Sequence, residues 1–429
     1  MSLGKRDRQH IWHPLTQHKT SGMPRGIVSA KGAVLVEEQG NELIDGIASW
    51  YTAMYGHCNP AIVQAVSEQL HRLDQIVFTG FTHGPAVKLA EKLLEILPNN
   101  QARVFFNDNG STAVEAAIKM ALQYFYNQGQ KRNTLIAFED GFHGDTFGAM
   151  SVSGLSVYNG PFEEHFLKVE RIPVPTDDNL SQVMEQLQAI LRQNSCAAFI
   201  FEPLVQGAAG MKFHSAAGLD RLIGLCKEQQ VLCIADEVMT GFGKTGRYFA
   251  SDHLLNKPDI ICLSKALTAG MMPMGITSCT REVYEAFLDK EVAKGFFHAH
   301  TYSANPPACA AAIAGIELLT SDEIKQQIDR INRRHKAFAA KLAGHPMVGE
   351  TRVLGVIFAL ELNIKMHRYG DLRNRLYQFY LEQGAFLRPL GNTVYILPPY
   401  VTTNAQLGVL YTAIEASLKF IEAGEQALS

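Results

Sequence analysis

Between residues 103 and 265, short apolar runs alternate with longer segments whose apolar residues recur at helical spacing. The runs occupy 103–108, 134–140, 197–203, 231–236 and 259–265. Strands that alternate with helices in this way form a mainly parallel sheet with helices on both faces. We therefore predict an α/β protein whose large domain holds such a sheet between its helices.

The chain is long enough to divide into a large domain and a smaller one. It has 429 residues, and beyond about residue 310 the pattern changes to a helix over 309–344, a further helix and short strands. The sequence predicts a large domain over 50–310 and a small α+β domain over 311–429. The N-terminal segment 1–49, with a hairpin in its second half, is predicted to join the small domain.

Composition excludes several classes of function. The net charge is −3 with 19% charged residues, so we expect no nucleic acid partner. No run reaches the roughly 18 apolar residues of a membrane helix, and the polar N-terminus does not resemble a signal peptide. The seven cysteines form no C-x-x-C pair, so we expect no metal site and reduced thiols. We expect a cytoplasmic protein without a membrane partner.

Polar residues follow each of the apolar runs. They are the segment 107–111, the segment GFHGD at 141–145, Glu202, Asp236 and Lys265. In open parallel sheets, ligands bind beyond the carboxyl ends of the strands, so these residues predict one active site. Within this site, Glu202 would form an ion pair with an arginine or orient a cofactor group. A histidine such as His143 more often has a structural role than a catalytic one.

The segment GFGKTG at 241–246 matches the G-x-G-x-x-G pattern of dinucleotide-binding loops. That pattern needs its first glycine directly after a strand and an acidic residue at the end of the next strand. Here the segment DEVMT intervenes between the strand and Gly241, and the next strand ends in Lys265. We therefore interpret the segment as a glycine-rich turn, and a nicotinamide oxidoreductase is the weaker alternative.

Asp236 and Lys265 end neighbouring predicted strands. An ordinary salt bridge would place the same two residue types there. The pair is also what pyridoxal phosphate requires, because a lysine binds its aldehyde and an acid binds its pyridinium nitrogen. Burial beside a cationic ring would lower the pKa of the lysine and make its amine a nucleophile and proton carrier.

The residues Gly110, Ser111 and Thr112 lie where a predicted strand turns into a helix. Thr112 and Glu115 have the spacing of a capping box, which would mark the start of that helix. Free N–H groups and the helix dipole attract a phosphate at such a place. An ordinary helix cap would look the same, but together with Asp236 and Lys265 the segment favours a phosphate site.

The segment 234–275, IADEVMTGFGKTGRYFASDHLLNKPDIICLSKALTAGMMPMG, resembles the signature of the class III pyridoxal-phosphate aminotransferases of fold type I. The resemblance extends over almost the whole chain and implies a homodimer with active sites at the subunit interface. In that family Gly110 and Ser111 would hold the cofactor phosphate with Thr301 from the partner subunit, and Phe142 would stack on the ring. Asp236 would bind the pyridine nitrogen, and Lys265 would bind the cofactor covalently. His300 is the remaining cofactor-binding residue that the resemblance implies.

Further motifs resemble one branch of this family. They are HIWHP at 10–14, SWYTAMYGH at 49–57, GFHGDTFGAMS at 141–151, EPLVQGAAGM at 202–211, HAHTYSANPPACAAA at 298–312 and RPLGNTVYILPPY at 388–400. The branch transfers the amino group of S-adenosylmethionine to 8-amino-7-oxononanoate, giving 7,8-diaminononanoate in biotin biosynthesis (EC 2.6.1.62). The substrate-binding residues implied are Leu15, Trp50, Phe142, Ala299, Arg388 and Tyr395. An arginine such as Arg388 grips a carboxylate through two parallel hydrogen bonds.

Two positions depart from the branch, which usually has tyrosine where this chain has Leu15 and Phe142. Each missing hydroxyl is a hydrogen bond of about 1 kcal/mol. The departures leave the cofactor prediction unchanged. They keep open the alternative that the protein is another ω-aminotransferase, with lysine, a diamine or a β-amino acid as amino donor. A catalytically silent subunit is a further alternative, but such a protein has no need to keep the lysine, the acid and the phosphate loop together.

Overall fold

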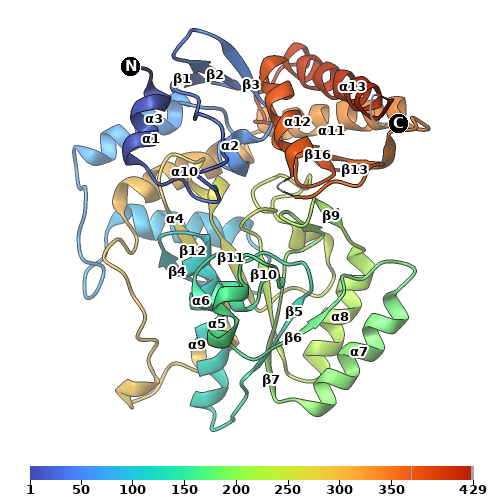
Figure 1. The fold of residues 1–429 in the computed structure, drawn as a ribbon. Helices are drawn as coiled ribbons and strands as arrows, with labels where there is room; N and C mark the ends of the chain where they lie inside the picture. The colour runs from blue at the N-terminus through green and yellow to red at the C-terminus, as the bar shows by residue number, and fades with distance from the viewer. Residues whose placement is uncertain (369, 427–429) are drawn as a thin grey trace.

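The computed structural model describes residues 1–368 and 370–426, with a large domain below a smaller one in Figure 1. In this part of the chain, seven strands form the central sheet in the order β4-β12-β11-β10-β7-β5-β6, and β12 alone among them is antiparallel to its neighbours. The strands are β4 (Gln101–Asn107), β5 (Thr134–Phe138), β6 (Val169–Ile172), β7 (Cys196–Phe201), β10 (Leu232–Asp236), β11 (Ile260–Leu263) and β12 (Gly275–Thr280). The predicted α/β class with a mainly parallel sheet is confirmed.

Helices cover both faces of this sheet because side chains along a strand alternate in direction. In β5, Leu135 and Ala137 belong to the apolar core under helix α5 (Gly110–Asn127), whereas Ile136 and Phe138 belong to the opposite core. That second core also takes up apolar residues of α4 (Gly84–Ile96), α7 (Leu180–Gln193) and α8 (Ala216–Glu228). The strands are therefore buried on both sides, and only their ends remain for polar chemistry.

The smaller domain combines the C-terminal part of the chain with N-terminal strands. The elements are β1 (Ile27–Lys31), β2 (Val34–Glu37), β3 (Glu42–Asp45), α11 (Asp322–Leu342), β13 (Val348–Leu354), β14 (Ile357–Leu362), α12 (Asp371–Glu382), β15 (Ala385–Phe386), β16 (Thr393–Ile396) and α13 (Asn404–Gln426). Strand β3 pairs in parallel with β15, so Ile44 lies opposite Ala385. This pairing joins segments that are more than three hundred residues apart in the sequence.

The prediction of one helix over 309–344 is wrong. The structure has α10 (Pro306–Thr320) and α11, separated at Ser321. Ser321 accepts a hydrogen bond from the Ile324 N–H at 3.3 Å and so caps α11. The predicted domain boundary between residues 310 and 311 lies inside α10, which packs against α3 (Pro60–Leu70) and α4.

Shorter elements connect these layers. They are α1 (Leu3–His10), α2 (Ala48–Tyr51), α6 (Phe147–Ser151), α9 (Arg281–Glu285), β8 (Val205–Gln206), β9 (Lys212–Phe213) and the 3-10 helices η1 (Gly160–His165), η2 (Ala250–His253), η3 (Lys265–Thr268) and η4 (Val292–Lys294). Across the described ranges, no helix combines the length and apolar character needed to cross a membrane.

Candidate active site

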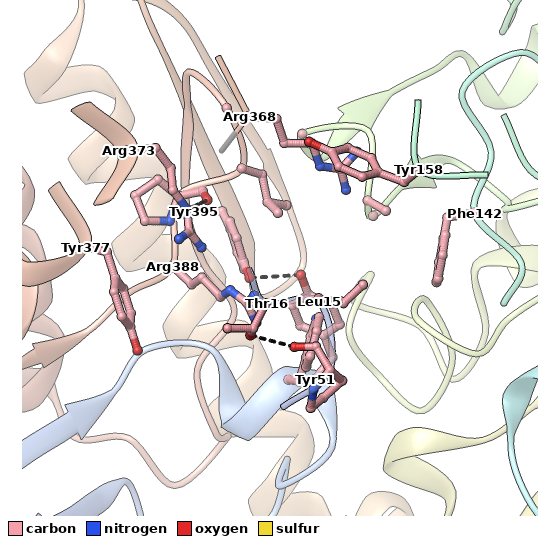
Figure 2. A pocket seen from close by; sticks show the side chains of 18 of the residues that line it. Leu15, Thr16, Tyr51, Phe142, Tyr158, Arg368, Arg373, Tyr377, Arg388 and Tyr395 are labelled. Atoms are coloured by element: carbon pink, nitrogen blue, oxygen red, sulfur yellow. Dashed lines mark hydrogen bonds between the residues drawn. The ribbon is translucent and has the colours of Figure 1, made fainter. Parts of the chain in front are cut away.

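A pocket lies where the carboxyl edge of the central sheet faces the small domain, and Figure 2 shows its small-domain side. The structure brings most of the predicted site residues to its lining: Leu15, Trp50, Gly110, Ser111, Phe142, Asp236, Lys265, Arg388 and Tyr395. Ala299, His300 and Thr301 do not line it in this single chain. Ala299 and Thr301 are exposed instead.

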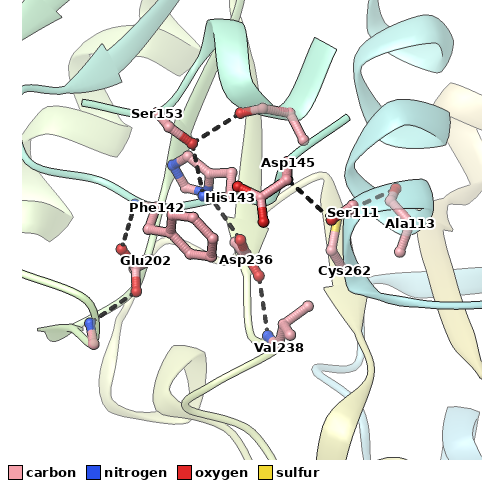
Figure 3. Close-up of polar contacts among 12 residues, drawn as sticks. Ser111, Ala113, Phe142, His143, Asp145, Ser153, Glu202, Asp236, Val238 and Cys262 are labelled. Carbon is pink, nitrogen blue, oxygen red and sulfur yellow. Dashed lines mark hydrogen bonds and ion pairs between the residues drawn. The ribbon is translucent and has the colours of Figure 1, made fainter. Parts of the chain in front are cut away.

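Asp236 is fixed by two contacts at the end of β10. Its Oδ2 lies 2.8 Å from His143 Nδ1, and its Oδ1 accepts a hydrogen bond from the Val238 N–H at 3.0 Å (Figure 3). The side chains of Asp236 and His143 are both buried. Because His143 supports the carboxylate from behind, Asp236 stands at a fixed position on the wall of the pocket.

Lys265 follows β11 and adopts a left-handed backbone conformation with φ of 50°. Burial lowers the pKa of its amine below the ordinary lysine value, although the negative charges of Asp236 and Glu202 act in the opposite direction. Its Nζ lies 5.3 Å from the centre of the Tyr51 ring. The amine thus lies at the pocket, and burial shifts it toward the neutral form that can accept a proton.

Glu202, at the end of β7, binds backbone rather than an arginine. Its two carboxylate oxygens accept hydrogen bonds from the N–H groups of Phe142 and Gly207, both at 2.9 Å. Burial raises the pKa of Glu202 to about 7; His143 opposes the shift and Asp236 adds to it. The carboxylate therefore positions the segment that carries Phe142, whose ring lies at the pocket and is 43% exposed (Figure 3).

The start of α5 differs from the predicted capping box. Asn109 is the cap, because its Oδ1 accepts from the Thr112 N–H at 3.0 Å and its own N–H donates to Thr112 Oγ1 at 3.1 Å. Glu115 lies in the second turn of the helix, where it accepts from the N–H of Gly148 at 2.7 Å. The helix therefore begins three residues earlier than the predicted capping box implied. The N–H groups at the start of its first turn are those of Gly110 and Ser111.

A second glycine, Gly144, packs closely against the turn at the start of α5. A Cβ added at Gly144, where φ is +132°, would lie 2.1 Å from Ser111 Oγ. The N–H of Asp145 donates to the same Oγ at 3.3 Å. Backbone from two loops thus surrounds the start of α5, as a phosphate cradle requires.

The opposite wall of the pocket comes from α2 and the small domain. The guanidinium carbon of Arg388 lies 4.7 Å from the centre of the Trp50 ring. Among the described residues, Arg388 forms no hydrogen bond or ion pair. A guanidinium that stacks on an aromatic ring and keeps its donors free is suited to binding a carboxylate.

The α2 turn itself is strained. The four consecutive residues Ala48, Ser49, Trp50 and Tyr51 all have φ between 47° and 128°, a region that costs non-glycine residues about 1–2 kcal/mol each. Asp45, which is fully buried, holds the turn. Its carboxylate accepts from the N–H groups of Ile47 at 3.0 Å and Ser49 at 2.7 Å, and from His57 Nε2 at 2.7 Å.

The GFGKTG segment has a structural role, as interpreted from the sequence. Lys244 is fully buried, and its Nζ donates to the carbonyl of Gly241 at 2.9 Å. The Lys244 carbonyl accepts from the Val356 N–H at 2.9 Å, and Tyr400 donates to the Phe242 carbonyl at 2.6 Å. The glycine-rich turn therefore fastens the large domain to the small one, and its lysine is not available to a nucleotide.

Sequence reasoning missed three features of this site. It assigned no contact between His143 and Asp236, it gave Asp45 no role, and it assigned Tyr51 no hydrogen bond. Asp45 follows an apolar strand just as Asp236 does, so the strand-end pattern could have found it. The other two contacts join residues that are 93 and 344 positions apart, and no local pattern reports them.

A family model described as aminotransferase class III matches residues 16–418. The chain belongs to the class III aminotransferase family and is an aminotransferase. The adenosylmethionine-8-amino-7-oxononanoate aminotransferase of Synechococcus elongatus is 43% identical over 94% of this chain and 97% of that protein. The enzyme of the same name from Geobacter sulfurreducens is 37% identical over 97% of both chains.

Solved structures match the fold. That of the adenosylmethionine-8-amino-7-oxononanoate aminotransferase of Methanocaldococcus jannaschii has a TM-score of 0.91 at 32% identity, covering 96% of this chain and 98% of the other. An amine transaminase from an uncultivated Pseudomonas species, solved with bound pyridoxal phosphate, has a TM-score of 0.89 at 29% identity over 95% and 98% of the two chains. A transaminase of this fold thus holds this cofactor in its solved structure.

Proposed function

We propose that the protein transfers an amino group from S-adenosylmethionine to 8-amino-7-oxononanoate, giving 7,8-diaminononanoate, with pyridoxal phosphate as cofactor. The observation that carries the proposal is the pocket that Asp236 and Lys265 share with Arg388. The names of the similar proteins in Synechococcus and Geobacter support the choice of substrates. Biotin biosynthesis is the process in which this reaction would serve.

The residues present fit the cofactor. Gly110 and Ser111 would hold its phosphate at the start of α5, where the close approach of Gly144 leaves only backbone and a hydroxyl. Asp236 would bind the pyridine nitrogen, and Phe142 would lie against the ring. Lys265 would bind the aldehyde carbon. When bound, pyridoxal phosphate supplies an electron sink for the carbanion at the substrate carbon.

The protein's own part in the reaction is proton transfer and orientation. Lys265 Nζ takes a proton from the carbon that bears the amino group and later returns one, and burial lowers the pKa of this amine in the direction that the role requires. Glu202 fixes Phe142 through the backbone, and His143 fixes Asp236. Arg388 binds the carboxylate of the keto acid and so sets which carbon reaches Lys265.

Leu15 and Phe142 are the observation that favours a second candidate, an ω-aminotransferase with another donor such as lysine. Leu15 is 56% exposed at the pocket and offers no hydrogen bond to a substrate. Solved ω-transaminases from Pseudomonas jessenii are 26% identical to this chain at a TM-score of 0.90, so the fold does not separate the two candidates.

An absorbance titration tests the proposal. We expect the purified protein with pyridoxal phosphate to show a visible band that S-adenosylmethionine abolishes and 8-amino-7-oxononanoate then restores. A band that ignores S-adenosylmethionine but responds to lysine would replace the first candidate by the second. Absence of the band after cofactor is supplied would overturn both.

We further propose that the enzyme is a cytoplasmic homodimer in which His300 and Thr301 of one chain complete the cofactor site of the other, and Ala299 its substrate site. The support is that these residues lie away from the pocket of their own chain. Both ring nitrogens of His300 are also buried without a described hydrogen-bond partner. Sedimentation should give the mass of two chains, and Thr301→Ala should weaken cofactor affinity without dissociating them.

A further inference from the structure

The orientation of Arg388 depends on an aromatic contact. Its guanidinium carbon lies 4.7 Å from the centre of the Trp50 ring, and no hydrogen bond or ion pair fixes it in the part of the chain that the structure describes. A guanidinium binds a carboxylate through two parallel hydrogen bonds only when its plane is correctly placed. The position of Trp50 therefore decides how well Arg388 is arranged for a ligand.

Trp50 lies in a turn whose backbone conformation its own residues do not favour. The four residues 48–51 all have φ between 47° and 128°, and none of them is glycine. Residues with a Cβ rarely adopt this region, because the Cβ approaches the backbone carbonyl oxygen. A turn of this kind keeps its shape only where neighbouring groups hold it. The contact between Trp50 and Arg388 therefore needs an anchor outside the turn.

Asp45 provides this anchor. Its side chain is fully buried, and its carboxylate accepts hydrogen bonds from the N–H groups of Ile47 at 3.0 Å and Ser49 at 2.7 Å. His57 Nε2 lies 2.7 Å from Oδ2, the oxygen that Ser49 also contacts. Both carboxylate oxygens are thus engaged. Asp45 therefore holds the start of the turn and does not compete with a ligand for Arg388.

The end of β3 also fixes the segment that carries Arg388. Asp45 is the last residue of β3 and lies opposite Phe386 in the parallel pairing with β15, which ends two residues before Arg388. The next N–H group, that of Gly46, donates to the Phe386 carbonyl at 3.1 Å. A Cβ added at Gly46 would lie 2.5 Å from a side-chain atom of the residue after Phe386, so the two segments approach closely. One strand end thus sets the positions of both members of the cation–π contact.

We propose that Asp45 is a positioning residue for the acceptor substrate: by holding the α2 turn against the Arg388 segment, it fixes the carboxylate site and so sets the length of keto acid that the pocket accepts. The inference rests on the proposed function, in which Arg388 binds the far carboxylate of 8-amino-7-oxononanoate. A fixed number of methylene groups separates that carboxylate from the keto carbon. A carboxylate site that cannot shift favours one chain length, whereas a mobile site accepts several.

Chain-length selectivity is the first test. The wild-type enzyme and Asp45→Asn are compared with 8-amino-7-oxononanoate and with the homologous keto acid that has one methylene group fewer. We expect Asp45→Asn to raise KM for the longer acid about 10-fold with kcat changed less than about twofold, because ground-state binding is what the variant loosens. The ratio of kcat/KM between the two acids should fall about threefold or more. A lower kcat at unchanged KM, or an unchanged ratio, would overturn the inference.

His57 offers a milder form of the same change. Its ring contacts one oxygen of Asp45 and its side chain is 15% exposed, so its removal leaves both backbone hydrogen bonds to the carboxylate in place. His57→Ala should raise KM for the longer acid about threefold, and His57→Gln, which keeps a donor, should restore part of the loss. If Asp45→Asn does not fold and His57→Ala changes neither KM nor the selectivity, the inference is wrong.

Asp220→Asn is the matched control. Asp220 of α8 accepts a hydrogen bond from the Asn256 N–H at 2.6 Å and does not line the pocket. The substitution removes the charge of an acid that holds backbone, as Asp45→Asn does. We expect a lower Tm with unchanged KM and unchanged selectivity. If Asp220→Asn lowered the selectivity as much as Asp45→Asn, a general loss of stability would explain both effects, and the positioning role would be refuted.

Tryptophan fluorescence gives a readout without turnover. The chain has two tryptophans, so Trp12→Phe leaves Trp50 as the reporter in the holoenzyme. Release of the turn in Asp45→Asn should move the Trp50 ring away from Arg388 into water and shift its emission to longer wavelength. Asp220→Asn should leave the emission unchanged. An Asp45→Asn spectrum identical to that of the wild type would show that Asp45 does not position Trp50 and would overturn the inference.

Failure of the proposed function is distinguishable from failure of this inference. If the wild-type enzyme does not react with 8-amino-7-oxononanoate, the proposed function is wrong, and the acceptor role of Asp45 is wrong with it. If the wild-type enzyme reacts and prefers this acid over its shorter homologue, the proposed function stands. An Asp45→Asn variant that keeps the same preference and the same Trp50 emission would then overturn the inference alone.

Discussion

The two walls of the pocket are built by different means. The large-domain wall uses residues at the ends of adjacent parallel strands, and two of them, Glu202 and Asp236, are fixed by short contacts to backbone N–H groups. The small-domain wall combines the strained α2 turn, which Asp45 holds through two backbone N–H groups, with residues from β16 and from the loop that precedes it. Under the proposed function, the rigid wall carries the cofactor and the proton transfer, and the wall assembled from distant segments carries the choice of substrate.

The largest expected effect tests the large-domain wall. Lys265→Ala should lower the rate of amino transfer by about 10³-fold or more, because proton transfer at the substrate carbon loses its base. Single-turnover absorbance measures it. Lys244→Ala is a useful contrast, since that lysine does not line the pocket and its Nζ donates to the Gly241 carbonyl, so its loss should lower the melting temperature more than the rate. If Lys265→Ala kept nearly the wild-type rate, the large-domain wall would not supply the base for proton transfer.

Arg388→Ala tests the small-domain wall with the next largest effect. We expect kcat/KM for 8-amino-7-oxononanoate to fall by about 10- to 100-fold, because the free guanidinium over Trp50 loses its carboxylate contact. The cofactor's absorbance should not change. Arg388→Lys should recover only part of the loss, since lysine cannot form two parallel bonds. If Arg388→Ala weakened cofactor binding as much as it lowered kcat/KM for the keto acid, the two walls would not have separate roles.

Asp45→Ala should destabilise the fold by about 2 kcal/mol, because two backbone N–H groups and His57 lose their acceptor. Chemical denaturation measures the change. Asp45→Asn keeps one carbonyl oxygen and should lose less. If the strained turn does not depend on Asp45, both variants will have the free energy of unfolding of the wild type, and the fluorescence of Trp50 will be unchanged.

Glu202→Gln should alter how stability depends on pH. The folded pKa of about 7 lies above the ordinary value of 4.5, so the folded state holds the extra proton between these values and stability falls as pH rises through that window. The variant should flatten this decline by up to about 1.4 kcal/mol per pH unit. Denaturation at several pH values measures it, with exposed Glu228→Gln as the control. An unchanged slope would mean that Glu202 stays ionised.

The smallest effect sharpens the difference in substrate choice. Leu15→Tyr should raise kcat/KM for the keto acid about fivefold, the gain of roughly one hydrogen bond. Leu255→Tyr, at an 89% exposed position, is the control. A loss instead of a gain would show that the pocket is fitted to leucine and to a different acceptor.

Much of the large domain could be predicted from local patterns. The run 134–140 corresponds to β5 at Thr134–Phe138, and the run 231–236 to β10 at Leu232–Asp236. Residues that end such strands necessarily meet at one edge, so the sequence alone was enough to pair Asp236 with Lys265. The capping box failed because Asn109 is a competing cap three residues earlier, and spacing alone does not decide which cap forms.

The sequence by itself determined the apolar strands, the order of polar residues at their ends and the resemblance to a family of cofactor-dependent enzymes. These follow from periodicity and short motifs, which act over a few residues. Only the tertiary structure decided that Tyr51 meets Tyr395, that His143 supports Asp236 and that β3 pairs with β15. Those contacts depend on how the domains pack, because a side chain's partner across hundreds of residues is set by the whole core and not by its neighbours in the chain.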